Sequence, residues 1–485
     1  MSHEVSRRQF LTTSFGALLG SVVLPDPTLA NAPFLSPQAA SPASPATTIR
    51  AMKRTLEING KAADVMGLLQ PNGMQGMTSV VTAPFQVTLD NQLPVPTAIH
   101  WHGLHPPNNE DGVPGVTQLP IRPGASDFYN FPIQPAGTHW MHSHQGLQEA
   151  FLLAAPLIVH DPADHVRDEQ EIVLMLSDFS FTPPKEISAK LRQGQKQRPQ
   201  AAMEMKGPAK PDANDVNYDA YLANDRTLLD PDGVKVEKNG KVRLRIINGS
   251  SGTNFFIDLG TLTGELIATD GIPIKPVRGN RFPLAIAQRI DVVVALPRDG
   301  GAFPILALRE LATEQTGIVL ATPGAKVSRL AVSGSSSTGL LTLDLESRLT
   351  AVNPLKAKPA DQTSVLRLQG NMSRYEWLIN DVAFNVANPG SEKPQVRVKE
   401  GQRVALKFVN ETPMSHPMHL HGHSFEVVAI NDRRFAGAIR DTILVPGKTS
   451  VTVEFDANNP GLWYVHCHIL WHLDAGMAAL VQYEA

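Results

Sequence analysis

The chain has 485 residues and a net charge of −3, with 42% hydrophobic and 18% charged residues. This near-neutral balance gives no basic surface for nucleic acid or anionic lipid, so we exclude partners of those kinds. No segment reaches the run of about 18 apolar residues that spans a bilayer, so we expect no stable membrane insertion.

The N-terminus resembles a twin-arginine export signal. Ser6–Leu11 reads SRRQFL and leads into a modest apolar stretch, Phe10–Leu24, followed by the small-residue run Ala30–Ala32. The apolar stretch is too short to cross a bilayer, which favours a cleaved signal over an anchor. We therefore expect residues 1–32 to direct the chain through the twin-arginine translocation machinery to the periplasm. Residues 33–49, rich in Ser, Pro and Ala, are predicted to be a flexible lead.

The remainder has the pattern of an all-β protein. Its 36 Gly and 39 Pro mark many turns, and short strand-like runs recur between them, which predicts β-sandwiches rather than βαβ units. Two segments, Gln70–Met77 and Lys185–Asp215, are predicted to be irregular loops. The clearest strand runs are Phe85–Leu89, Val242–Ile247, Asp291–Leu296 and Ser450–Phe455.

Histidines are concentrated in four short motifs. Five His-x-His pairs are present among 16 histidines, far more than random placement would give. A spacing of two puts both imidazoles on one face of a strand, so the motifs predict metal ligands. We interpret His3, His105, His139, His160 and His165 as ordinary surface or core residues. The motifs are His100–Gly103 (HWHG), His142–His144 (HSH), His416–His423 (HPMHLHGH) and His466–His468 (HCH).

The motifs divide the chain into three predicted domains. A first domain at 50–164 and a third at 360–485 contain two motifs each, whereas a middle domain at 165–325 contains none. A linker at 326–359, with the low-complexity run Ser333–Thr338, precedes the third domain. Because the ligands come from both ends of the chain, we expect the first and third domains to pack together around a metal cluster.

Cys467 is the only cysteine, so it cannot form a disulfide within the chain, and it lies between His466 and His468. On a strand the two histidines point to one face and the thiol to the other. His472 and Met477 follow closely enough to turn back towards the sulfur. A thiolate, a thioether and two imidazoles are the ligands of a blue-copper electron-transfer site. The segment therefore predicts a path for electrons from a metal bound at the cysteine to other metals bound at the flanking histidines, about 10 Å away.

From about residue 50 to its end, the chain resembles the multicopper oxidases, the family of laccases, ascorbate oxidase and bacterial copper-efflux oxidases. The family's four motifs stand here in the family's order. The resemblance implies three cupredoxin-like Greek-key β-sandwich domains and four copper ions: one type 1, one type 2 and a type 3 pair. The implied ligands are His416, Cys467, His472 and Met477 for type 1, His100 and His419 for type 2, and His102, His142, His144, His421, His466 and His468 for type 3.

The resemblance also implies that the chain passes single electrons from a donor to O2, which is reduced to water. Asp111 stands where the family carries an acidic residue near the type 2 copper, and we expect it to supply protons through water. Many bacterial members have a glutamate directly after the last type 1 histidine, where this chain has Leu473 followed by Asp474. The sequence therefore leaves the second proton route open. His423 is expected to support the site without binding copper.

The sequence leaves two classes of electron donor open. A laccase-like oxidase would take electrons from phenols or aromatic amines at His472 or His416, whereas a cuprous oxidase of copper tolerance would bind Cu(I) through thioethers. The methionine pairs 74/77, 203/205 and 414/418 could serve the second class. However, 13 methionines and no methionine-rich insertion favour packing roles. We favour the laccase-like function, in a monomer.

Three other classes of protein fit the sequence less well. A copper-free exported scaffold would not need the complete ligand set. A two-domain copper nitrite reductase would lack the third domain and the His466/His468 pair, and an electron-transfer protein would not need ligands for a trinuclear cluster. The intact set therefore predicts an oxidase.

Overall fold

The computed structural model describes residues 46–194, 214–371 and 374–484, which include neither the predicted signal peptide nor His3. Strands are the main regular structure of these residues and helices are few, so the predicted all-β class is confirmed. In this part of the chain no helix is both long and apolar enough to cross a membrane.

Six sheets lie in three consecutive pairs along the chain. The first pair has strand orders β2-β1-β4-β6 and β3-β8-β7-β5, formed by β1 (Thr47–Ile58), β2 (Lys61–Leu69), β3 (Met77–Val80), β4 (Pro84–Asn91), β5 (Ile99–His100), β6 (Ser126–Pro132), β7 (Gly137–Ser143) and β8 (Ala154–His160).

The second pair has orders β10-β9-β12-β17-β14-β15 and β11-β19-β18-β13-β16. Its strands are β9 (Gln170–Phe179), β10 (Ala220–Ala223), β11 (Asp232–Lys235), β12 (Lys241–Asn248), β13 (Phe255–Asp258), β14 (Gly264–Thr269), β15 (Ile272–Gly279), β16 (Arg281–Leu284), β17 (Arg289–Ala295), β18 (Ala302–Arg309) and β19 (Gln315–Ala321).

The third pair has orders β21-β20-β23-β29-β25-β26, with β27 beside β25, and β22-β31-β30-β24-β28. Its strands are β20 (Gln362–Asn371), β21 (Glu376–Ile379), β22 (Val396–Lys399), β23 (Arg403–Asn410), β24 (His416–Leu420), β25 (Phe425–Ile430), β26 (Arg433–Arg434), β27 (Ile439–Arg440), β28 (Thr442–Val445), β29 (Ser450–Asp456), β30 (Leu462–Cys467) and β31 (Ala478–Glu484).

Each pair of sheets repeats one connectivity. The first strand of each pair of sheets lies parallel to a later strand of the same sheet: β1 to β4, β9 to β12 and β20 to β23. The second sheet of each pair has its own parallel contact: β3 to β8, β11 to β19 and β22 to β31. Parallel neighbours need a crossover connection, because a tight hairpin can only join antiparallel strands. The repeat therefore has the crossed connections expected of Greek-key sandwiches.

The four predicted strand runs are confirmed in β4, β12, β17 and β29, where only Leu296 falls outside its strand. The first strand begins at Thr47, so the predicted lead is wrong for residues 47–49, which pair with β4. The predicted loop Gln70–Met77 is irregular as far as its last residue, which begins β3.

The predicted loop Lys185–Asp215 is wrong in its first third, where α1 (Pro184–Gly194) forms. Proline suits the first turn of a helix, because its missing N–H has no partner there anyway. Ile187 and Leu191 are one turn apart and pack against the core of the third pair of sheets, which stabilises the helix. Residues 195–213 of that predicted loop, which include Met203 and Met205, lie outside the described residues, and its last two residues, 214–215, are irregular as predicted.

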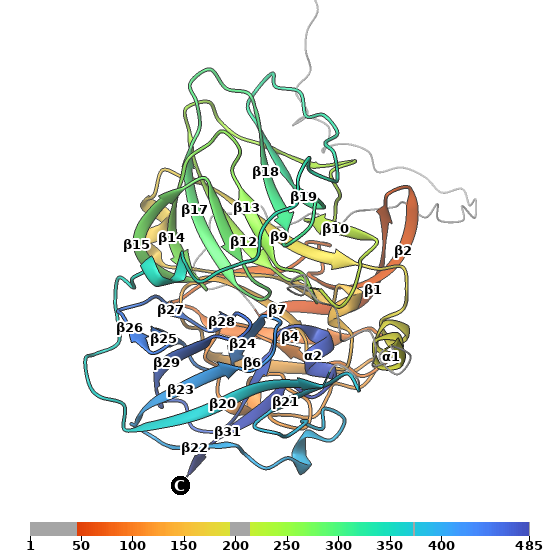
Figure 1. Ribbon diagram of the computed structural model, residues 1–485. Helices are drawn as coiled ribbons and strands as arrows, with labels where there is room; N and C mark the ends of the chain where they lie inside the picture. The colour runs from red at the N-terminus through yellow and green to blue at the C-terminus, as the bar shows by residue number, and fades with distance from the viewer. Residues whose placement is uncertain (1–45, 195–213, 372–373, 485) are drawn as a thin grey trace, which may run out of the picture.

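The second pair of sheets lies above the first and third, which lie together (Figure 1). The yellow-to-green strands β9–β19 form the upper body in that view, and the blue strands of the third pair lie among the orange strands of the first. Trp140 of β7 belongs to the same buried cluster as Phe408 of β23 and Ile247 of β12, so the core is continuous across all three.

A buried ion-pair network joins the first and second pairs of sheets. Asp291 of β17 accepts hydrogen bonds from Arg243 (2.7 Å), Arg245 (3.1 Å) and the Thr138 hydroxyl. Asp291 and Arg245 are fully buried. Removing one partner of such a network leaves buried charge uncompensated, which costs far more than the loss of a surface pair.

We expect Asp291→Leu to destabilise the protein by about 3–5 kcal/mol, because it removes the carboxylate that two buried guanidinium groups share. The shift in the midpoint of chemical denaturation measures this. Arg278→Ala is the control, since Arg278 and Glu265 are exposed and 3.7 Å apart, and its expected cost is below about 1 kcal/mol. Equal shifts for the two variants would contradict the structural role of the network.

Candidate metal centres

The four histidine motifs meet at the junction between the first and third pairs of sheets. His100 of β5 pairs in register with His142 of β7. His419 of β24 pairs with His466 of β30. The histidines of these two strand pairs are almost completely buried, and the two pairs face each other, since the Nε2 atoms of His100 and His419 are 3.3 Å apart. Motifs separated by more than 300 residues therefore form one site.

Four of the groups that this junction forms each bring three possible ligand atoms within 4.8 Å of one another. The cysteine belongs to one of these four groups. The six predicted type 3 ligands separate into two sets of three, a division that could not be read from their spacing in the sequence. The groups are His100–His102–His419, His102–His142–His468, His144–His421–His466 and His416–Cys467–His472.

Hydrogen bonds fix the tautomers of several rings. Nδ1 of His100, His419 and His466 donates to the backbone oxygen of Asp111, Asp441 and Cys467 respectively, each at 2.9 Å. Nδ1 of His421 donates to the Asp111 carboxylate at 2.8 Å. A neutral imidazole has one proton, so the other nitrogen of each ring carries an unshared pair.

These unshared pairs point at each other. Nε2 of His100 lies 3.3 Å from Nε2 of His419, and Nε2 of His421 lies 3.0 Å from Nε2 of His466. With both protons on the Nδ1 side, neither contact has a hydrogen to share. Two acceptors at this distance repel unless a cation lies against them, so the geometry fits a metal ion.

Burial keeps the imidazoles neutral. Desolvation lowers the pKa of His466 to about 4 and lowers the pKa of the other members of this set well below the usual value, with the neighbouring rings adding to the effect. Nε2 of His142, His144 and His468 is buried without a hydrogen-bond partner among the described residues. Neutral imidazoles with free nitrogens suit copper. The rings concerned are His102, His142, His144, His419, His421, His466 and His468.

The cysteine group has the same arrangement. Cys467 Sγ lies 3.7 Å from Nδ1 of His416 and 3.6 Å from Nδ1 of His472, and these two nitrogens are 3.1 Å apart. The outer nitrogens are occupied: His416 Nε2 bonds the Thr412 hydroxyl at 2.8 Å, and His472 Nε2 donates to Asp215 at 2.8 Å. The unshared pairs therefore face the sulfur.

Met477 is held beside the cysteine by the backbone. The Cys467 N–H donates to the Met477 carbonyl at 3.0 Å, and the Met477 N–H donates to the His472 carbonyl at 2.9 Å. α2 (Leu470–Asp474) makes this return possible, because one helical turn brings His472 back over the strand end. Met477 is fully buried. Burial raises the pKa of the Cys467 thiol far above its usual value, so a cation is needed to hold the thiolate.

Three buried carboxylates surround the histidines. Asp111 touches His421 and lies 3.2 Å from His100 Nδ1. Glu149, at the start of the 3₁₀ turn Glu149–Phe151, lies 2.7 Å from His142 Nδ1 and 4.0 Å from His468 Nδ1. Burial raises the pKa of the Glu149 carboxyl well above its usual value. The third carboxylate, Asp441, lies 3.0 Å from His102 Nε2.

The middle pair of sheets contributes to the site through Asp441. Arg289 of β17 donates to the Asp441 carboxylate at 2.7 Å and to the Thr138 carbonyl at 3.0 Å. Asp270 accepts from the Asp441 and Thr442 backbone N–H groups at 3.3 and 3.2 Å. The segment that supports His102 and His419 is thus held by two residues of a domain that has no ligand of its own.

Leu473 and Asp474, which follow His472, do not take the place of the glutamate that many bacterial members have after this histidine. Leu473 packs with apolar neighbours, including Tyr464 and Phe384. The Asp474 carboxylate accepts from the Ser188 hydroxyl (2.6 Å) and from Arg192 (2.8 Å), both in α1. Asp474 thus anchors α1, and no histidine contacts its carboxylate among the described residues.

Four histidines outside these groups contact other residues. His423 Nε2 bonds the Tyr483 hydroxyl at 2.7 Å, His105 bonds the Ser424 hydroxyl at 3.0 Å, and His139 bonds the Pro135 carbonyl at 3.0 Å. His160 lies 2.7 Å from Glu171. None of these four belongs to a three-ligand group of the described residues.

Four residues of the site were not predicted from the sequence: Asp215, Glu149, Asp441 and Arg289. Each is distant in sequence from the ring or carboxylate that it contacts, apart from Glu149, which lies seven residues after His142. That short separation from a histidine motif was the local signal available for Glu149. No local pattern could have indicated the other three.

Comparisons with known proteins give a single family. Three models described as multicopper oxidase match residues 73–164, 170–325 and 357–485. The multicopper oxidase MmcO of Mycobacterium tuberculosis is 31% identical over 408 residues, covering 82% of this chain and 79% of that protein. Laccase-1 of Thanatephorus cucumeris is 26% identical, covering 88% and 90%. Copper resistance protein A of Escherichia coli is 26% identical, covering 81% and 85%.

Among solved structures, that of Fet3p, a multicopper oxidase that functions in iron import, matches with a TM-score of 0.74 at 19% identity and covers 90% of both chains. This likeness confirms the predicted cupredoxin-like sandwich fold.

Glu149 gives a test of the site that does not depend on activity. Glu149→Leu removes the oxygen beside His142 Nδ1, and we expect the affinity for one copper to fall about 10–100-fold, as for other groups that orient a metal-binding histidine. Glu149→Gln keeps an acceptor oxygen and should retain copper. Copper per chain after dialysis against a chelator, measured by atomic absorption, distinguishes the variants. Glu171→Gln, which alters a similar His–Glu contact at His160, is the control, and equal copper loss in all three would remove Glu149 from this role.

Proposed function

We propose that this chain, which belongs to the multicopper oxidase family, oxidises a donor at a type 1 copper and reduces O2 to water at a trinuclear copper cluster. The chain is a copper-dependent oxidoreductase, as the family is. The facing imidazole nitrogens carry this proposal, since buried unshared pairs 3.0–3.3 Å apart require cations between them.

The proposed type 1 ligands are His416, Cys467, His472 and, as the weak axial ligand, Met477. The proposed type 2 ligands are His100 and His419. His102, His142 and His468 would hold one type 3 copper, and His144, His421 and His466 the other. The three-ligand groups support this division. Four coppers so held would accept single electrons at the thiolate site and supply four together to O2.

The chain connects the two centres through Cys467. Its side chain faces His416 and His472, while the adjacent His466 and His468 face the trinuclear groups. An electron arriving at the sulfur therefore has a covalent route of one residue in either direction. A single strand end fixes this geometry, because neighbouring side chains of a strand point to opposite faces.

Asp111 is proposed to hold and deliver protons. Its carboxylate touches His421 and lies 3.2 Å from His100, so it lies beside both the type 2 and one type 3 set. Gly112 keeps it there: a Cβ at this position would lie 1.9 Å from the Ile99 oxygen, and its φ is +87°. General acid catalysis requires a group fixed within hydrogen-bond reach, and this backbone provides it.

Small reactants have a route to the cluster. A cavity of about 490 Å³ is lined by His144, Tyr464, Leu473 and Asp474. His144 is the one trinuclear histidine of the described groups that is half-buried rather than buried. We propose that O2 and water pass through this cavity, whose wall includes the position where the family often has its second acid.

For the donor, we propose laccase-like oxidation of phenols or aromatic amines. Among the described methionines, Met414 and Met418 are buried, as the sequence predicted, so they offer no surface thioethers near the type 1 site for Cu(I). Asp215 accepts hydrogen bonds from His472 Nε2 and from the Tyr375 hydroxyl, so it orients the His472 ring. Burial would raise the Asp215 pKa, but the charge and hydrogen bond of His472 outweigh it and hold that pKa below its usual range.

Copper tolerance is the second candidate function, supported by the relative named copper resistance protein A. Export by the twin-arginine route to the periplasm, and a monomeric state, are further proposals that rest on the sequence.

Copper-loaded protein should consume O2 faster with 2,6-dimethoxyphenol than with Cu(I) and should show an intense blue colour.

Cys467→Ser should lose the colour and the phenol-driven uptake, because it removes the thiolate, and should bind three coppers instead of four. Met477→Leu is the matched control, expected to stay blue with a higher reduction potential. An oxygen electrode, visible spectra and copper analysis make these measurements. Faster uptake with Cu(I) would favour copper tolerance, and full turnover in Cys467→Ser would exclude the proposed electron route.

Asp111→Asn should slow O2 reduction by about 10²-fold, the usual contribution of a positioned general acid. Bleaching of the blue colour by a phenol without oxygen should keep its wild-type rate, because Asp111 does not touch the cysteine group. Stopped-flow spectroscopy separates the two steps. If both slowed equally, Asp111 would have no specific part in proton delivery.

A further inference from the structure

A very short helix places His472. This helix, α2, has five residues, and its N-cap residue Ile469 forms no capping hydrogen bond with its side chain. An isolated helix of this length does not form in water, because fixing one turn costs more conformational entropy than its few hydrogen bonds return. The position of His472 therefore depends on contacts between α2 and the rest of the molecule.

The first turn of α2 is hydrogen-bonded to the middle domain. The Leu470 N–H donates to the Ser251 carbonyl at 2.9 Å. The indole N–H of Trp471 donates to the Tyr218 hydroxyl at 2.8 Å. Leu470, Trp471 and Ser251 are buried. One contact supplies an acceptor for an N–H group that has no partner inside the helix. The other fixes the side chain next to His472.

The bond between Trp471 and Tyr218 belongs to a chain of hydrogen bonds with a fixed direction. The Tyr218 hydroxyl lies 3.0 Å from the Ser251 hydroxyl, which donates to the Asp178 carboxylate at 2.7 Å. An indole can only donate and a carboxylate can only accept. Since the Ser251 proton is used on Asp178, the Tyr218 hydroxyl donates to Ser251 and accepts from Trp471. Bonds in such a chain polarise and strengthen one another.

Asp178 gives this chain a fixed end. Its buried carboxylate accepts from the backbone N–H groups of Ser251 and Gly252 and from the hydroxyls of Ser251 and Thr253, at 2.7–2.9 Å. Burial raises the pKa of the Asp178 carboxyl, and these hydrogen bonds oppose that shift. Asp178 belongs to β9, which lies between β10 and β12 in its sheet. The chain therefore connects α2 to the core of the middle domain.

Gly252 allows the Tyr218 hydroxyl to reach the indole. A Cβ at Gly252 would lie 2.5 Å from the Tyr218 hydroxyl oxygen and 3.3 Å from Trp471 Nε1, both closer than ordinary van der Waals contact. A side chain at this position would push the hydroxyl away from Trp471. The hydrogen-bond chain therefore requires glycine here for reasons of space.

The last turn of α2 is bonded to the middle domain as well. Arg192 of α1 donates to the backbone oxygen and to the carboxylate of Asp474, both at 2.8 Å. A basic side chain at a helix C-terminus satisfies carbonyl groups that have no partner in the helix. The Arg192 side chain is 46% exposed, so water weakens this contact and the buried contact at Tyr218 contributes more.

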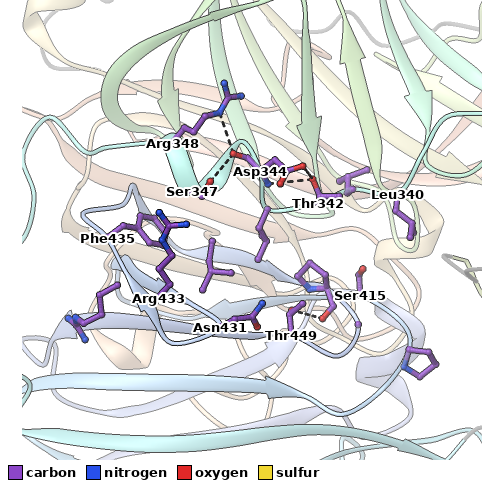
Figure 2. Close-up of a pocket in the computed structure, with 17 residues that line it drawn as sticks. Leu340, Thr342, Asp344, Ser347, Arg348, Ser415, Asn431, Arg433, Phe435 and Thr449 are labelled. Atoms are coloured by element: carbon purple, nitrogen blue, oxygen red, sulfur yellow. Dashed lines mark hydrogen bonds between the residues drawn. The ribbon is translucent and has the colours of Figure 1, made fainter.

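The linker after the middle domain meets the third pair of sheets differently. A cavity of about 840 Å³ lies between the segment 340–348 and one edge of those sheets, and Ser415, next to His416, lines it. Each hydrogen bond drawn in Figure 2 joins residues on one side of this cavity, as Thr342 with Asp344. Among the residues drawn, no hydrogen bond thus crosses from the linker towards His416.

We propose that Tyr218 is a positioning residue that holds α2, and with it His472, in place for the type 1 site, an inference that rests on the function proposed above. Tyr218 acts through Trp471, whose indole it fixes, whereas Asp215 bonds the His472 ring itself. Without the Tyr218 hydroxyl, the first turn of α2 opens more often and the His472 ring is less well oriented towards Cys467.

Tyr218→Phe tests this proposal, because it removes only the hydroxyl. In copper-free protein, hydrogen exchange of the amides of residues 470–477, followed by mass spectrometry, should become about tenfold faster, the effect of losing one hydrogen bond. In copper-loaded protein, the blue colour should disappear at an about tenfold lower chelator concentration, while the other coppers stay bound, as for groups that orient a metal-binding histidine. Gly252→Ala should change both quantities in the same direction, because it displaces the same hydroxyl.

Tyr221→Phe is the matched control. Tyr221 lies three residues after Tyr218, and its hydroxyl is buried without a hydrogen-bond partner among the described residues. The same chemical change there should leave the exchange rate and the chelator titration at their wild-type values.

The outcomes separate this proposal from the proposed function. Wild-type exchange in Tyr218→Phe, or faster exchange with an unchanged chelator titration, would overturn the positioning role and leave the proposed function standing. Equal changes in Tyr221→Phe would also overturn it, because the effect would then be one of the middle domain as a whole. Copper-loaded wild-type protein without blue colour would contradict the type 1 site itself.

Discussion

The structure depends on imidazole nitrogens that are forced together with no proton between them. Backbone carbonyls and carboxylates hold the outer nitrogen of each ring, so the inner unshared pairs of His100 and His419, and of His421 and His466, face each other within 3.3 Å. Burial opposes protonation, which would otherwise relieve the repulsion. Such an arrangement is stable only with cations, so folding of the junction and copper binding support each other.

Two features of the fold maintain this strained arrangement. The strand pairs β5–β7 and β24–β30 each place histidines opposite one another in register, and the rigidity of a hydrogen-bonded ladder prevents their separation. The middle domain adds Arg289 and Asp270, which hold the segment around Asp441 from behind. A domain without a histidine motif thus helps to determine where the histidines of the other two lie, which is more than a spacing role.

The group His416–Cys467–His472 is connected differently on its two sides. Cys467 joins it to His466 and His468, members of two other three-ligand groups, by one peptide bond on either side, so the inner connection is fixed by covalent structure. On the outer side, Asp215 and Tyr375, both distant in sequence, cover His472, and Thr412, four residues away, covers His416. The inner connection is therefore local to one strand end, whereas the cover over His472 depends on tertiary contacts with the second and third domains.

The all-β class and the family could be predicted from the sequence alone, because the His-x-His spacing and the lone cysteine act through local strand geometry. The division of six histidines into two groups of three could not be predicted, since it depends on how strands from opposite ends of the chain meet. It predicted a loop where α1 forms, because that helix is stabilised by Ile187, Leu191 and the pairing of Arg192 with Asp474, all of them tertiary contacts.

The positions of Asp215, Asp441 and Arg289 beside the site likewise depend on tertiary structure. The local sequence around a carboxylate does not show whether an imidazole lies beside it in the folded chain. The possible metal ligands lie in short sequence motifs because a metal needs particular ligand atoms. The groups that orient those ligands need only be near them in space.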